Sequence, residues 1–71
     1  MDGRVAALVE AATAGDDRRT DAAVEALRPF RWIADAAPAL AAWRQAPKDR
    51  AERLERVWLD ATGHTLREVV D

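Results

Sequence analysis

The stretch from residue 46 to residue 63 constrains the fold more than any other part of the chain, because it carries a helix signal at both ends. Pro47 suits the first helical position, where its missing N–H costs nothing. Gly63 suits the position just past the end, where the backbone turns left-handed. Between them, apolar residues recur at helical spacing on one side: Ala51, Leu54, Val57, Trp58 and Ala61. The sequence therefore predicts an amphipathic helix against which the other segments pack.

The opposite side of this predicted helix is charged. Acids precede arginines by four residues, Asp49 before Arg53 and Glu52 before Arg56, and each such pair contributes about 0.2–0.5 kcal/mol. Burial of a large apolar side chain contributes roughly 1.5–3 kcal/mol. We therefore expect the apolar face to hold the helix in place and the charges to keep it soluble.

The N-terminal part predicts two helices joined by a charged turn. The first helix covers residues 3–14, with Asp2 as its cap and Gly15 at its end. Residues 16–19, which read Asp-Asp-Arg-Arg, indicate a charged turn that serves as a solvated loop or a helix cap. The apolar stripe of the first helix consists of Val5, Leu8, Val9 and Ala12.

A second helix is predicted over residues 21–28, capped by Asp17 or Thr20. Pro29 then interrupts the pattern. In a continuous helix the proline ring would clash with the carbonyl of Glu25, so we expect a break or kink at this point.

Three prolines, Pro29, Pro38 and Pro47, each suit the first turn of a new helix. Pro29 opens a predicted helix to residue 37, and Pro38 opens one to residue 46. The residues expected to point inward from these two segments are Phe30, Ile33, Ala34, Ala37, Leu40 and Trp43.

After Gly63, Thr65 and Glu68 form the capping-box pattern T-x-x-E at the start of a short last helix. So short a helix must dock, and the end of the long helix near Trp58 is its expected support. Strand alternation is absent. The sequence predicts one all-α domain over residues 1–71, a compact bundle of five or six short helices, or four if Pro29 and Pro38 are only kinks.

Composition speaks against catalysis. The chain has no cysteine and no serine, and His64 is its one histidine. No zinc, calcium or phosphate-loop spacing occurs. Asp60 with His64 could form an acid/base pair, but a loop histidine near a helix end is the favoured interpretation. We therefore expect no enzyme, no cofactor and no bound metal.

Charge and hydropathy limit the partners. Eleven basic and thirteen acidic residues are interleaved, for a net charge of −2, which argues against a nucleic-acid or anionic-membrane surface. No signal peptide or membrane span is predicted. The abundance of alanine and of arginine over lysine suggests a bacterial source, and we expect a cytoplasmic protein.

A small nucleic-acid-binding regulator is the alternative, because the long helix, the Gly63 turn and the last helix have helix-turn-helix order. The last helix offers Leu66, Arg67 and Glu68, and lacks the asparagine, glutamine or second arginine that reads bases. On the long helix, basic and acidic residues alternate: Arg50, Arg53 and Arg56 with Glu52 and Glu55.

Protein binding is the function that remains. Trp32 projects off the apolar face predicted for its segment, with Arg28 and Arg31 beside it, and exposed Trp with Arg is typical of interface hot spots. A core position for Trp32 is an equally open interpretation. Leu59 is a second candidate, although Leu66 or Val70 could cover it. The sequence thus predicts an adaptor, an inhibitor or a self-associating domain whose partner is another protein or a second copy.

Overall fold

Six helical segments follow one another along residues 3–70, the part of the chain that the computed structural model describes. They are α1 (Arg4–Ala14), α2 (Asp17–Leu27), the 3-10 helix η1 (Arg28–Ile33), α3 (Ala37–Gln45), α4 (Lys48–Thr62) and α5 (Leu66–Val70). Within this range there is no strand. The prediction of an all-α bundle of five or six short helices is confirmed. The four-helix version is wrong, because extended backbone at Ala34 (ψ 131°) separates η1 from α3.

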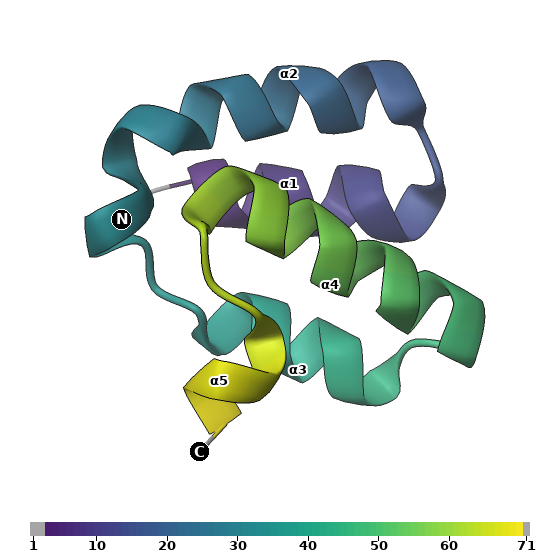
Figure 1. Ribbon diagram of the computed structural model, residues 1–71. Coiled ribbons are helices and arrows are strands. Elements are labelled where there is room, and N and C mark those ends of the chain that lie inside the picture. Colours follow the sequence, from purple (N-terminus) through teal and green to yellow (C-terminus); the bar gives the residue numbers. More distant parts are fainter. Residues whose placement is uncertain (1–2, 71) are drawn as a thin grey trace.

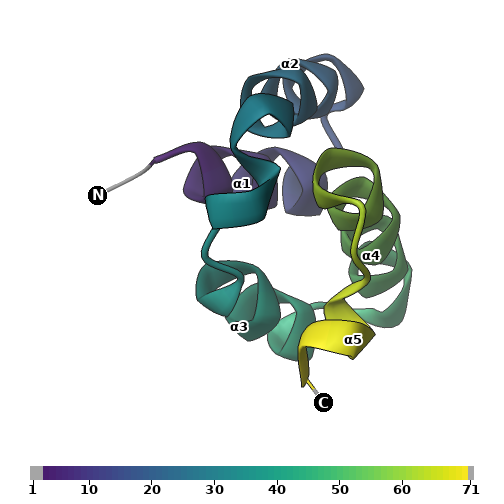
Figure 2. The same cartoon turned by 60° about the vertical axis from the view of Figure 1, so that its left-hand side comes forward.

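The helices form a bundle around α4 (Figure 1). Helices α1 and α2 make an antiparallel hairpin, and α1, α3 and α4 pack against one another. Helix α5 rests against α3 and α4, as its shortness required. When the molecule is turned, η1, the end of α4 and α5 come forward together at one end of the bundle (Figure 2). The predicted long helix is therefore the element that touches every other helical segment.

The core consists of apolar side chains from all five α-helices. Each of α1, α2, α4 and α5 supplies one fully buried leucine, namely Leu8, Leu27, Leu54 and Leu66. Trp58 is 2% exposed and lies among them. Because each of these side chains contributes roughly 1.5–3 kcal/mol, the stripe predicted on α4 carries much of the stability.

Both predicted glycine stops are confirmed. Gly15 and Gly63 have φ angles of 75° and 79°, the left-handed region that ends a helix. Helix α4 begins one residue later than expected, with Pro47 at the N-cap and not at the first helical position. Differences of one residue at helix ends are usual. Asp2, the expected cap of α1, lies outside the described residues.

The loop expected over residues 16–19 is wrong, whereas the helix cap expected there as its alternative is present. Helix α2 begins at Asp17, and the Asp16 carboxylate accepts a 3.1 Å hydrogen bond from the backbone N–H of Arg19. The left-handed residue Gly15 reverses the chain so tightly that the cap follows at once. Asp16 is therefore the N-cap, where the sequence suggested Asp17 or Thr20.

The segment after Pro29 also differs from the prediction. It is a 3-10 helix with three residues per turn, so the inward stripe expected at α-helical spacing does not form. Ile33 is 56% exposed, and Phe30 is half-buried with the Arg4 guanidinium carbon 3.9 Å from its ring centroid. Leu40 and Trp43 of α3 are half-buried and pack at the edge of the core.

Candidate functional site

Trp32 and Ile33, which we call the η1 tip, are the two most exposed large apolar side chains of the described residues. Trp32 is 80% exposed. Pro29, one turn of the 3-10 helix before Trp32, is also exposed. Of the two interpretations that the sequence left open for Trp32, the core position is therefore excluded.

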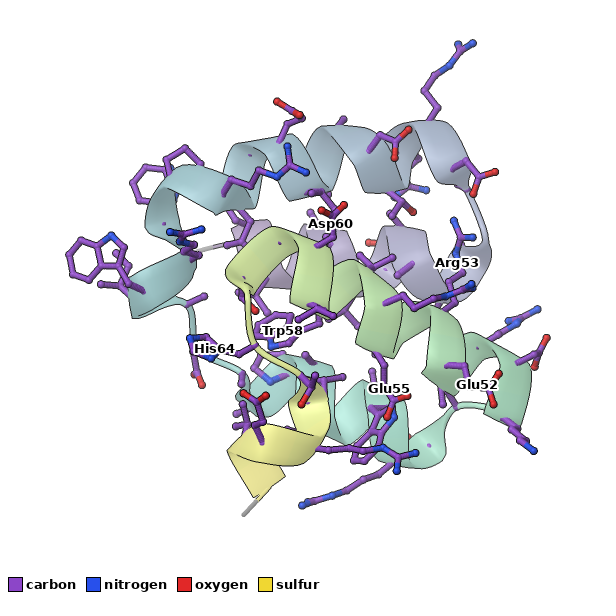
Figure 3. The ribbon with its side chains drawn as sticks, viewed as in Figure 1. Glu52, Arg53, Glu55, Trp58, Asp60 and His64 are labelled. Carbon is purple, nitrogen blue, oxygen red and sulfur yellow. The ribbon has the colours of Figure 1, made fainter. Side chains whose placement is uncertain are left out.

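Arg28, at the start of η1, is engaged within the chain. Its guanidinium donates hydrogen bonds to Glu25 (3.1 Å) and to Asp60 of α4 (2.9 Å). Figure 3 shows Asp60 on the side of α4 that faces α2. Arg28 thus fixes η1 against α4, while Arg31 is exposed and has no ion pair among residues 3–70. Of the two predicted arginines, Arg31 is the one available to a partner.

Leu59 lies beside the last helix, where the sequence suggested that Leu66 or Val70 could cover it. It is 46% exposed, because Leu66 of α5 points into the core and leaves it uncovered. Cover by Leu66 is therefore wrong, and the side chain of Val70 lies outside the described residues. Leu59 lines a shallow cavity of about 240 Å³ together with Thr65 and Arg67. The structure groups Leu59 with α5 and not with the η1 tip.

A larger open groove of about 350 Å³ lies between the end of α3, the first half of α4 and Arg67 of α5. We call it the α3–α4 groove. Trp43 and Ala51, both half-buried, give it an apolar surface. Its charged residues are Arg44, Lys48, Glu52, Glu55 and Arg67. Sequence reasoning missed this groove because Trp43 follows an apolar stripe and was expected to point into the core.

An ion pair forms one wall of this groove. Nε of Arg67 donates a 2.9 Å hydrogen bond to the Glu55 carboxylate. This hydrogen bond and the charge of Glu55 raise the pKa of Arg67, so its positive charge is secure. Figure 3 shows Glu52 and Glu55 on the half of α4 near the end of α3. Glu52, Lys48 and Arg44 are exposed and take part in no ion pair among the described residues.

The residues that could have supported other chemistry are separated. Asp60 bonds Arg28, and Nδ1 of His64 lies 3.4 Å from the Glu68 carboxylate, so the two have different partners. No cluster of three or more potential metal ligands exists within residues 3–70. In the same range, no helix combines the length and apolarity needed to cross a membrane.

Comparison of the chain with family models, with curated proteins and with solved structures finds no match. The geometry of the η1 tip and of the α3–α4 groove is therefore the basis on which a function is argued.

Proposed function

We propose that this protein is a non-enzymatic protein–protein interaction module, and that the η1 tip is its principal contact with the partner. The observation that carries the proposal is the 80% exposure of Trp32 beside the exposed Ile33. A tryptophan side chain can bury about 150–250 Å² on contact. Tryptophan and arginine are also the residues most enriched in interface hot spots, and Arg31 directly precedes Trp32.

The way the tip is held supports this role. The hydrogen bonds from Arg28 to Glu25 and to Asp60 fix the start of η1 to both α2 and α4. Trp32 therefore projects from a segment of regular 3-10 helix whose first residue is bonded to the rest of the bundle. The buried apolar core does not include Trp32, so the indole is not needed to pack the core.

The alternative, a nucleic-acid-binding regulator, has less support. Its recognition helix would be α5, which has five residues. In α5, Leu66 is buried and Arg67 is bonded to Glu55, so neither is positioned to read a base.

The first test uses the tip itself. Short helical peptides displayed on phage would be selected on the wild-type protein, and binding would then be measured to Trp32→Ala. We expect Trp32→Ala to keep its far-ultraviolet circular dichroism and to lose most selected binders. Val69→Ala, at an exposed apolar residue of α5 that is not a candidate contact, is the matched control and is expected to keep them.

Three results would contradict the proposal. Binders that ignore Trp32→Ala would place the contact elsewhere. Loss of helicity in Trp32→Ala would make the residue structural. A salt-dependent shift of a generic DNA duplex by the wild-type protein would favour the nucleic-acid alternative.

A further inference from the structure

We propose that the partner of the η1 tip is a second copy of this chain, whose α3–α4 groove receives Trp32. This inference rests on the proposed function, because it names the partner of the same tip. It adds the groove, which the tip alone does not imply, as the receiving surface.

The first argument is apolar complementarity. The tip offers an indole and an isoleucine side chain with little cover. The groove, of about 350 Å³, offers the half-buried indole of Trp43 and the methyl group of Ala51. Aromatic pairs gain attraction in offset or edge-to-face contact beyond the area that they bury. A tryptophan from another copy is thus a suitable occupant of the groove.

The second argument is that the η1 tip and the α3–α4 groove each carry charges of both signs, which can pair with opposite charges on the other surface. The tip is bracketed by Arg31 before Trp32 and Asp35 after Ile33, and both are exposed. The groove carries Glu52 on one helix and the cations Arg44 and Lys48 around the α3–α4 junction. Arg31 can therefore pair with Glu52. The Asp35 carboxylate, one oxygen of which accepts a hydrogen bond from the N–H of Ala37, can pair with the cations. Opposed pairs of this kind set the register of an interface more than its affinity.

The third argument concerns symmetry. The tip and the groove are different surfaces, with η1 at one end of the bundle and the α3–α4 junction toward the other (Figure 1). A contact between surfaces at opposite ends of the bundle is heterologous, so a row of copies leaves one tip and one groove available as long as its rotation does not close a ring. The expected assembly therefore grows head to tail as concentration rises, in contrast to a symmetric dimer.

The decisive experiment mixes two defective variants. Trp32→Ala removes the tip, and Ala51→Gln fills the groove at a half-buried position without disfavouring the helix. Multi-angle light scattering over a wide concentration range should give a rising mass for the wild type and a monomer for each variant alone. The mixture should form a 1:1 dimer, because one variant retains its groove and the other its tip. The control, Arg18→Ala on the exposed side of α2, should behave as the wild type.

A charge exchange tests the register independently. Arg31→Glu and Glu52→Arg should each weaken association, on the order of tenfold or more, while the chain carrying both should recover most of it. A wild type that stays monomeric throughout, or a variant mixture that gives no dimer, would overturn the inference. If peptides still bind in a Trp32-dependent way in that case, the proposed function stands and only the identity of the partner falls. If neither self-association nor peptide binding depends on Trp32, both proposals fall.

Discussion

Arg53 of α4 donates a 3.1 Å hydrogen bond from Nε to the backbone carbonyl of Ala12, near the C-terminal end of α1. Its Nη2 also bonds the carboxylate of Asp17, in the first turn of α2. Arg53 was expected to pair with Asp49 on its own helix, yet it joins the ends of two other helices. One side chain thereby fastens the α1–α2 hairpin to α4.

Replacement of Arg53 by alanine should lower the free energy of unfolding by about 1–3 kcal/mol, because a carbonyl near the end of α1 loses a charged donor. Urea denaturation followed by circular dichroism would measure the loss. Arg50→Ala, an exposed arginine on the same helix, is the control and should change stability little. Equal effects of the two substitutions would contradict the role of Arg53.

The buried indole of Trp58 gives a second prediction. Its Nε1 is buried without a hydrogen-bond acceptor among the described residues, which costs about 1–3 kcal/mol. Trp58→Phe removes this unpaired donor along with part of the ring, so its stability should lie within about 1 kcal/mol of the wild type. Trp58→Ala should lose about 3–5 kcal/mol because it leaves a cavity. Thermal melts of both variants would show whether phenylalanine is the milder change.

Gly63 tests the left-handed end of α4. A Cβ at this position would meet no atom within 4 Å, so any cost comes from the φ angle of 79° alone. Gly63→Ala should lower stability by about 1–2 kcal/mol. Asparagine tolerates this conformation better, and Gly63→Asn should cost less than Gly63→Ala in the same denaturation experiment. The reverse order would show that backbone conformation is not the cause.

Asp16 tests the corrected start of α2. Asp16→Ala removes the acceptor for the N–H of Arg19 and should lower stability by about 0.5–2 kcal/mol. Asp16→Asn keeps an acceptor oxygen and should retain most of the wild-type stability. Asp21→Ala, an exposed acid further along α2, is the control. If Asp21→Ala proved as costly as Asp16→Ala, charge and not capping would explain the effect.

The parts of the fold that depend on local chemistry were predictable. Gly15 and Gly63 end their helices because each adopts the left-handed conformation, in which its own N–H bonds to carbonyls of the last helical turn. The stripe containing Leu54 and Trp58 is likewise a property of one helix. The all-α class follows from such signals without knowledge of which helices touch.

The parts that depend on distant residues were not predictable. The start of η1 is joined to α4 by the pair Arg28–Asp60, whose members are 32 positions apart. Because α-helical spacing was assumed, Ile33 was expected to point into the core. The same assumption left undecided whether Trp32 is a core or a surface residue. The α3–α4 groove likewise needs Arg67 beside Glu55, a contact across twelve positions that no local pattern indicates.

Helix α2 passes into η1 without an intervening loop, since Arg28 keeps helical angles (φ −48°, ψ −45°) as the winding tightens. The backbone that carries Trp32 is therefore part of one continuous helical stretch from Asp17 to Ile33. Binding through Trp32 does not require a flexible segment to become ordered, so the loss of conformational entropy on binding is small. The same residues therefore bind a partner more tightly on a helix than they would in a flexible segment.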